Sequence, residues 1–279
     1  MSNQLENIDS FLSSLKQHSY RTRCRFMEED NVFKKNTIKM GKIVKIFKKK
    51  LKQIKRKFKF IKLKFEGNQY KKWFGSEYGG FFVCEQILKN RDQVVVYSCG
   101  IGKDISFDAE IMKKYKQSEI FAFDPTPISM KWIENQKLPD NFYFSPIGIS
   151  DKNGIEKMYF PKKYGVSYGI FSWDSENKDQ IMVEMQTIES IAEEHGHKFI
   201  DILKMDIEGS EFVVLNSLDF KKIQFGQILV EFHERFLENG NKVLEKTIAI
   251  LEENGYECFA VSDDFEYSFI NKRFKTLEK

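Results

Sequence analysis

The sequence has few cysteines and no long apolar run, and each absence narrows what the protein can be. Its four cysteines lie far apart, with no Cys-x-x-Cys pair and no histidine nearby at metal-ligand spacing. This distribution argues against a disulfide framework or a structural zinc site, and it favours a reducing compartment. No apolar stretch approaches the length of a membrane span, and no N-terminal signal peptide is visible. We therefore expect a cytoplasmic protein.

The modest net charge of +4 conceals two regions of opposite sign. Residues 1–72 hold 21 Lys and Arg against 6 Asp and Glu, whereas residues 73–279 hold 24 against 35. An acidic body thus carries a basic N-terminal extension. An aromatic connector that contains several glycines separates the two regions. We place the boundary there, which predicts an extension of residues 1–75 and a globular domain of residues 76–279.

Residues 40–65 are the most basic part of the extension, with twelve basic residues and no acid between Lys42 and Lys64. Apolar residues recur there at spacings of three and four, which predicts a helix with one apolar and one cationic face. Such a helix could pack on the domain, or it could lie peripherally on an anionic membrane surface. Nucleic-acid binding is the weakest interpretation, because the stretch has a single Arg and an acidic body would repel phosphates.

From about residue 76 onward, apolar stretches typical of strands alternate with helical patterns. We expect strands at 94–98, 120–124, 142–145, 155–160, 199–205, 227–232, 256–262 and 266–270. We expect helices at 82–89, 104–117, 127–136, 187–195, 210–218 and 242–253. This alternation indicates a mostly parallel sheet with helices on both faces, but the last two strands, joined by a short turn, must be antiparallel. The sequence therefore predicts a Rossmann-like, doubly wound, seven-stranded α/β sheet that ends in an antiparallel hairpin.

A glycine turn after the first sheet strand is the first candidate for a binding site. Gly100-Ile101-Gly102 follows the apolar run Val94–Val96, and a helical pattern begins just beyond it. Such a turn lets a ligand approach the backbone closely. Asp124 ends the next strand, in the position of a carboxylate that binds ribose hydroxyls. The expected cofactor-binding residues at these strand ends are Ser98, Gly100, Gly102, Asp124, Thr126 and Gly148.

Charged residues gather at the end of a later strand, in the segment Lys204-Met205-Asp206-Ile207-Glu208-Gly209. Charges at the end of an apolar strand are costly unless they are paired or used. If the strand continues, positions 204, 206 and 208 share one face, and Lys204 could then pair with either carboxylate. A salt bridge beside a helix cap at Ser210 would explain the same residues without catalysis.

The following strand ends in Glu231 and His233, which alternate to one face. Because ligands bind at the carboxyl ends of parallel strands, Asp206 is expected beside them. Asp206, Glu231 and His233 could bind a hard divalent cation such as Mg²⁺ or Mn²⁺. Alternatively, Asp206 or His233 could accept the proton of a substrate hydroxyl. The candidate catalytic residues are Asp206, His233, Lys204 and Glu208.

Taken together, these segments resemble the FkbM-like family of class I S-adenosylmethionine-dependent O-methyltransferases, over about residues 90–262. The Lys-x-Asp-x-Glu-Gly core is the most specific part of the resemblance. Two positions depart from the family pattern, since Val96 replaces an acid and Ser98 replaces the first glycine of the turn. The segments that carry the resemblance are Val94–Gly102, Phe121–Pro125, Gly148–Asp151, Lys204–Glu211 and Val230–His233.

The resemblance implies S-adenosylmethionine as cofactor and methyl transfer to a hydroxyl, commonly on a sugar or a natural-product scaffold. A basic extension at the inner face of a membrane would suit an enzyme of glycan biosynthesis. Two rival interpretations remain. A NAD-dependent oxidoreductase would share the Gly-x-Gly turn and the following acid. A non-catalytic membrane-surface scaffold would keep the fold without activity. The oligomeric state has no signature in the sequence.

Overall fold

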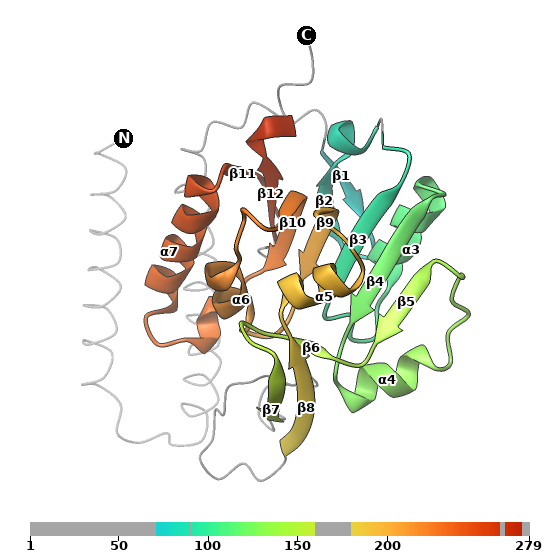
Figure 1. The fold of residues 1–279 in the computed structure, drawn as a ribbon, viewed down its shortest axis with the longest axis horizontal. Coiled ribbons are helices and arrows are strands. Elements are labelled where there is room, and N and C mark those ends of the chain that lie inside the picture. Colours follow the sequence, from blue (N-terminus) through green and yellow to red (C-terminus); the bar gives the residue numbers. More distant parts are fainter. Residues whose placement is uncertain (1–70, 90, 160–179, 263–265, 275–279) are drawn as a thin grey trace, which may run out of the picture. The chain divides into compact units, whose positions relative to one another are not determined.

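The computed structural model describes residues 71–89, 91–159, 180–262 and 266–274 (Figure 1). The chain divides into two compact units, Met1–Lys64 and Phe65–Lys279, and all the described residues belong to the second. The predicted amphipathic helix of residues 40–65 therefore lies outside the described residues. Among the helices that are described, none is long and apolar enough to cross a membrane.

A seven-stranded sheet forms the centre of the described unit, in the order β11-β12-β10-β9-β3-β4-β5. Strands β10, β9, β3, β4 and β5 run parallel, whereas β12 is antiparallel to both of its neighbours. This arrangement confirms the predicted Rossmann-like sheet with its reversed final strand. The strands are β3 (Val94–Cys99), β4 (Ser118–Phe123), β5 (Phe142–Ser145), β9 (Phe199–Met205), β10 (Gln224–Glu231), β11 (Tyr256–Val261) and β12 (Glu266–Asn271).

Helices follow the parallel strands, as a doubly wound sheet requires. Thr126 caps α4 by accepting a hydrogen bond from the backbone of Ser129, and Pro127 occupies the first turn, where it removes no needed donor. Gly255, at φ +89°, follows the end of α7 in the left-handed conformation that glycine favours. The helices are α3 (Ser106–Lys114), α4 (Pro127–Ile133), α5 (Ile188–Glu194), α6 (Glu211–Ser217) and α7 (Gly240–Glu253), with 3₁₀ turns η2 (Glu85–Leu88), η3 (Glu234–Phe236) and η4 (Lys272–Phe274).

The helix predicted at residues 82–89 is wrong in its first half. Residues Phe81–Cys84 form strand β2, which pairs antiparallel with β1 (Lys71–Phe74), and η2 follows. Aromatic and β-branched residues favour a strand over a helix at this point. Phe74 and Phe81 are buried in one core cluster with Phe107 of α3. The hairpin therefore packs on the same face of the large sheet as α3, and Phe74 belongs to the core although it precedes the predicted boundary at residues 75/76.

A second, three-stranded sheet was not predicted. It consists of β6 (Gly148–Ile149), β8 (Gln180–Gln186) and β7 (Gly154–Tyr159), in the order β6-β8-β7. Val183 and Met185 are buried while Glu184 between them is exposed, which is the alternation of a half-buried strand. The sequence showed residues 148–151 only as a turn and residues 183–185 only as the approach to a helix. The predicted loop of residues 161–178 lies outside the described residues.

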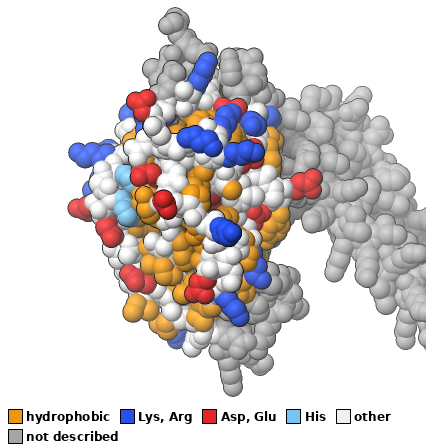
Figure 2. Space-filling view, turned by 90° about the vertical axis from the view of Figure 1, so that its right-hand side faces the viewer, with side chains coloured by type: hydrophobic (Ala, Val, Ile, Leu, Met, Phe, Trp, Pro, Cys, Tyr) orange, Lys and Arg blue, Asp and Glu red, His pale blue; other side chains and the backbone are white. Residues whose placement is uncertain are grey.

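The side of the molecule that carries α4 and β5 exposes Met130 and Tyr143. Figure 2 shows this side, on which apolar side chains gather in the lower middle and acidic and basic side chains are mixed around them. The mixture differs from the composition of residues 1–72, where basic residues outnumber acids more than threefold.

Candidate active site

The glycine turn lies where β3 ends, between the ends of β9 and β4. Gly100 has φ +78°, and a Cβ atom there would overlap the carbonyl oxygen of Asp206. Only glycine therefore allows the turn and the segment after β9 to approach so closely. Gly102 has φ +52° and faces open space. Ser98 is fully buried within β3.

Asp124 joins the glycine turn to the beginning of α4. Its Oδ2 accepts hydrogen bonds from the backbone N–H groups of Ile101 (3.2 Å) and Gly102 (2.9 Å). Its Oδ1 accepts from the backbone N–H of Thr126 (2.9 Å) and from the Thr126 hydroxyl (2.6 Å). Four donors thus converge on a carboxylate that is 5% exposed. Asp124 fixes the shape of the turn before any ligand arrives.

A cavity of about 300 Å³ opens between the turn, α4, the small sheet and the segment after β9. Its size lies at the lower end of the usual range for small-molecule sites, about 300–1,000 Å³. The predicted cofactor residues Gly100, Gly102, Asp124, Thr126 and Gly148 line it, whereas the wall does not include Ser98. Its wall also includes Tyr78, Asp104, Phe123, Ile128, Ile149, Met158, Met185, Lys204, Asp206 and Glu208.

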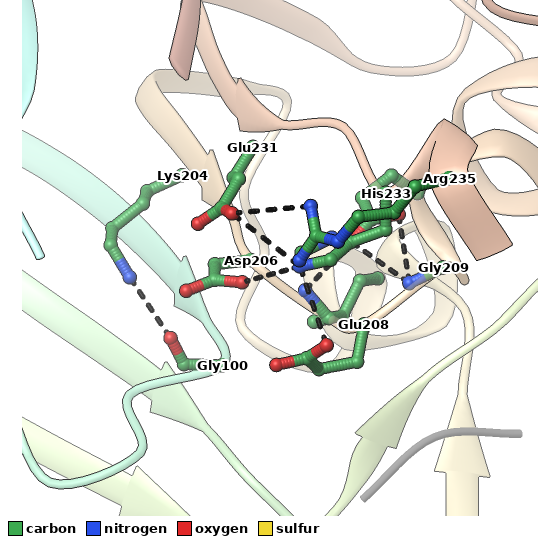
Figure 3. A network of polar contacts seen from close by, with 10 residues as sticks. Gly100, Lys204, Asp206, Glu208, Gly209, Glu231, His233 and Arg235 are labelled. Atoms are coloured by element: carbon green, nitrogen blue, oxygen red, sulfur yellow. Dashed lines mark hydrogen bonds and ion pairs between the residues drawn. The ribbon is translucent and has the colours of Figure 1, made fainter. Parts of the chain in front are cut away.

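Carboxylates surround His233 at one edge of this cavity (Figure 3). Nε2 of His233 lies 3.3 Å from Glu208, 3.6 Å from Glu231 and 3.7 Å from Asp206. The imidazole is 1% exposed, while the Asp206 side chain keeps 33% of its surface open. Asp206 and Glu208 line the cavity, and the histidine supports them from the protein side. The structure brings together the four groups that were predicted at the ends of β9 and β10.

Glu211 fixes the orientation of this histidine. Its Oε1 lies 2.8 Å from Nδ1 of His233, and the Glu211 side chain is fully buried. The same carboxylate accepts the backbone N–H groups of Ile207 (3.0 Å) and Gly209 (3.0 and 3.2 Å). With Nδ1 engaged in this way, Nε2 points toward the cavity acids. The sequence showed Glu211 only as an acid in the first turn of a helix, so its role was missed.

The backbone at Glu208 and Gly209 adopts an uncommon conformation, which determines where the Glu208 carboxylate points. Glu208 adopts φ +53° and Gly209 φ +107°. A non-glycine residue in the left-handed region costs free energy, about 1–3 kcal/mol, and such residues cluster at functional sites. Here the conformation directs the Glu208 carboxylate to Nε2 of His233.

Burial and mutual repulsion shift the protonation of these groups. Burial and the nearby Asp206 charge raise the pKa of Glu231 to about 8. Burial also raises the pKa of Asp206, and the His233 charge opposes this shift. For His233, burial would lower the pKa, but Glu211, Asp206 and Glu208 outweigh it and raise the pKa to about 10. At neutral pH the cluster therefore contains an imidazolium ion, and Asp206 and Glu231 are protonated more readily than usual.

A family model for the methyltransferase FkbM domain matches residues 47–258 of this chain. The chain belongs to the FkbM methyltransferase family. This assignment confirms the resemblance drawn from the sequence, and it covers the glycine turn, Asp124 and the whole acid–histidine cluster. It favours a methyltransferase over the nicotinamide-dependent oxidoreductase.

Among curated proteins, this FkbM-family chain is similar to human "Probable methyltransferase-like protein 24", with 26% identity over 148 residues. The match covers 52% of this chain and 34% of the human protein, so the chain spans about a third of that relative.

Among solved structures, the chain is similar to the fibrillarin of a fibrillarin/Nop5p complex (TM-score 0.39, 12% identity, 67% of this chain and 78% of that one). It is also similar to Aeropyrum pernix fibrillarin with natively bound S-adenosyl-L-methionine (TM-score 0.35, 12% identity, 75% and 84%). At such scores these similarities carry no functional argument.

One predicted site residue of the FkbM-family domain points elsewhere than expected. Strand β9 ends at Met205, so Lys204 does not share a face with the acids that follow. Its Nζ donates a hydrogen bond to the carbonyl oxygen of Gly100 (2.9 Å), as Figure 3 shows. Lys204 therefore braces the glycine turn, and in the part of the chain that the structure describes it forms no ion pair within 4.0 Å with Asp206 or Glu208.

Proposed function

We propose that this chain is an S-adenosylmethionine-dependent O-methyltransferase that acts on a hydroxyl group of a sugar or glycan. The observation that carries the proposal is the cavity shared by two sets of residues. The glycine turn and Asp124 line one part of its wall, and Asp206 and Glu208, supported by His233, line another. A cavity with a cofactor turn and a proton acceptor is what methyl transfer to a hydroxyl requires.

The cofactor is held, in this proposal, by Gly100, Gly102, Asp124, Thr126 and Gly148, all of which line the cavity. Asp124 offers the carboxylate for the ribose hydroxyls, which would share it with the backbone N–H groups of the turn. A Cβ atom at Gly148 would overlap the sulfur of Met185, so a larger residue there would displace the Met185 side chain in the cavity wall. S-adenosylmethionine supplies an activated methyl group, so the protein needs only to align the hydroxyl and remove its proton.

Asp206 is the proposed proton acceptor. With the methyl donor bound, the acceptor oxygen would bond to the methyl carbon as the sulfur–methyl bond breaks, and the Asp206 carboxylate would take up the hydroxyl proton. Since burial raises the pKa of Asp206, this carboxylate accepts a proton more readily than an exposed aspartate. His233 is already protonated at neutral pH, so it serves as the partner that holds the Asp206 and Glu208 charges. Release of the proton to solvent resets the site.

The same cluster also fits a divalent cation. Asp206, Glu208 and Glu231 converge on Nε2 of His233 at 3.3–3.7 Å, and oxygen with imidazole nitrogen suits Mn²⁺ or Mg²⁺. Asp206, Glu211 and His233 also have ligand atoms within 4.8 Å of one another, but Glu211 holds Nδ1. We therefore assign Asp206, Glu231 and His233 as ligands and Glu211 as the group that orients the imidazole. Because a protonated imidazole cannot coordinate a metal, cation binding would displace the protons of His233 and Glu231. A bound cation would lower the pKa of a coordinated hydroxyl.

The proposal is tested by calorimetry, with S-adenosylmethionine and NAD as ligands, and by release of S-adenosylhomocysteine over a panel of acceptors. The panel contains monosaccharides and oligosaccharides, with matched amino sugars and sugar acids, each with Mn²⁺, Mg²⁺ or a chelator. We expect binding of S-adenosylmethionine without binding of NAD, and turnover on neutral sugars. Cofactor binding with methylation confined to amino or carboxyl groups would reject the hydroxyl acceptor. Cofactor binding without turnover on any acceptor would favour a non-catalytic scaffold.

Peripheral attachment to the inner face of a membrane, through residues 40–65, is a separate part of the proposal. The twelve basic residues between Lys42 and Lys64 support it. It would place the enzyme beside lipid-linked glycans. In flotation with vesicles, we expect the chain to rise with anionic lipid and to remain below with neutral lipid. Equal flotation with both lipids, or with neither, would remove the membrane role and leave packing on the domain.

A further inference from the structure

The cavity has two chemically different ends. Apolar side chains from β4, α4 and the small sheet line one end, beside the Asp124 carboxylate, namely Phe123, Ile128, Ile149, Met158 and Met185. Charged side chains from β9 and the start of α3 line the other, namely Lys204 and Asp104 together with Asp206 and Glu208. In the sheet order, β9 and β4 lie on opposite sides of β3, so these two groups are separated by the glycine turn.

Lys204 is a buried cation with unused donors. Its side chain is 3% exposed, and Nζ donates to the Gly100 carbonyl at 2.9 Å and lies 5.6 Å from the centre of the Phe81 ring. An ammonium group has three N–H donors. Besides the bond to Gly100, the remaining donors have no hydrogen-bond partner among the residues that the structure describes. Asp108 of α3, fully buried, supplies a nearby negative charge, since Lys204 opposes the rise of its pKa.

Asp104 is an oriented anion on the same wall. Its Oδ1 accepts the backbone N–H of Ser106 at 2.7 Å, and its Oδ2 accepts the hydroxyl of Ser76. Burial would raise the pKa of Asp104, but these hydrogen bonds and the Lys204 charge outweigh it and lower the pKa. The loop that holds Ser76 joins β1 to β2 and is fixed in turn, because the backbone N–H of Ser76 donates to the Ser106 hydroxyl at 2.7 Å.

We propose that Lys204 binds the α-carboxylate and Asp104 the α-ammonium group of the amino-acid end of the methyl donor. This inference rests on the proposed function, because it assigns the charged end of the same cavity. The donor is a molecule with two unlike ends, a flat purine and a zwitterion, and the cavity offers an apolar end and a pair of opposite charges. Lys204 is then a cofactor-binding residue rather than a catalytic one.

The test uses three ligands that differ only at this end. S-adenosylhomocysteine carries both charged groups, decarboxylated S-adenosylhomocysteine keeps only the ammonium, and methylthioadenosine has neither. Calorimetry on the full chain should show that Lys204→Met weakens binding of S-adenosylhomocysteine about 10- to 100-fold, the range for a hydrogen bond to a charged group. The same variant should change binding of the other two ligands by less than about twofold to threefold. Asp104→Asn should weaken both ligands that keep the ammonium, and leave methylthioadenosine unaffected.

Two further variants control for fold and for general charge. Lys113 is exposed on α3 and does not line the cavity, so Lys113→Met removes an equal charge and should have little effect. Lys204→Met could unfold because Asp108 loses its partner. In that case the double variant Lys204→Met/Asp108→Asn, which removes both buried charges, is used in place of the single variant. Thermal unfolding of each variant without ligand reports which one to use.

The outcomes separate this inference from the proposed function. If wild-type chain binds none of the three ligands, both are overturned. If it binds S-adenosylhomocysteine and methylthioadenosine equally well, the cofactor site stands and the assignment of Lys204 and Asp104 fails. The assignment also fails if Lys204→Met weakens all three ligands alike, or if Lys113→Met weakens binding as much as Lys204→Met does.

Discussion

Two carboxylates follow β4 and β9, the strands on either side of β3, and their surroundings give the same chemical group two different roles. Asp124, after β4, is surrounded by N–H and O–H donors from the turn and from Thr126. Asp206, after β9, faces Glu208, Glu231 and the imidazole of His233. The donors hold the Asp124 carboxylate in one orientation, whereas burial, and to a smaller extent the neighbouring acids, raises the pKa of Asp206. The first environment suits a fixed binding group and the second a group that takes up a proton.

If this contrast is correct, the largest effect should come from Asp206→Asn. The amide cannot accept the hydroxyl proton. We therefore expect turnover to fall by about 10²- to 10⁴-fold, which is the usual rate acceleration contributed by a general base. The affinity for S-adenosylhomocysteine should stay within about threefold, since Asp124 and the turn are intact. Methyl transfer to the best acceptor of the panel and calorimetry measure the two quantities. Asp140→Asn, on an exposed turn, is the matched control. Near-normal turnover in Asp206→Asn would end the assignment of Asp206 as base.

The next effect tests what holds the Asp206 region in place. Glu211→Ala removes the acceptor of two backbone N–H groups and of His233, all inside the protein. Leaving a buried ionic network without one partner costs about 3–5 kcal/mol. We expect the free energy of unfolding in urea to fall by at least about 3 kcal/mol. The exposed Glu193→Ala on α5 should change it by less than about 0.5 kcal/mol. A loss below about 1 kcal/mol in Glu211→Ala would show that Glu211 does not support the cluster.

The sequence predicted this region well in one respect and badly in another. It placed Asp206, Glu231 and His233 together, because the carboxyl ends of adjacent parallel strands meet at one edge. It could not predict Glu211, because a helix first turn commonly carries an acid and nothing local shows that this one is buried. It offered Lys204 a pairing with Asp206 or Glu208 only if the strand continued past residue 205, and that condition is not met. The backbone leaves the strand there, and Glu208 takes a left-handed conformation that no side-chain pattern indicates.

The region around Asp124 was predicted more completely, since a strand, a glycine turn and an acid are local features of the sequence. The sequence did not predict the small sheet that lines the cavity beside Asp124. Its strands come from residues 148–149, 154–159 and 180–186, and the pairing of distant short segments is not visible in any one of them. The hairpin β1–β2 was missed for the same reason, because its β1 half resembled a connector.

A smaller effect should follow from changing Asp124. Asp124→Asn keeps the size of the side chain but replaces one acceptor oxygen with a donor, which opposes N–H groups of the turn or of Thr126. We expect a loss of about 1–3 kcal/mol in the binding free energy of S-adenosylhomocysteine. Thr126→Val removes one donor to Asp124 and the cap of α4 but leaves the Asp124 carboxylate in place, so it should lose less than half as much binding free energy. Calorimetry on both variants makes the comparison. If Asp124→Asn bound the ligand as tightly as the wild type, the turn would not depend on this carboxylate.

The last prediction concerns the dependence of stability on pH, and it tests the protonation of the acid–histidine cluster. His233 has a pKa of about 10 in the folded chain and 6.5 as its ordinary value. Between these values the folded state keeps a proton that the unfolded chain has lost, so stability falls as pH rises through this window. Glu231, raised from 4.5 to about 8, acts in the same direction at lower pH. Each 1 kcal/mol lost should lower Tm by about 2–4 °C. We expect His233→Gln, measured with a chelator present, to show a smaller fall in Tm between pH 6.5 and 10 than the wild type. An equal fall in both proteins would mean that the imidazole does not hold its proton among these acids.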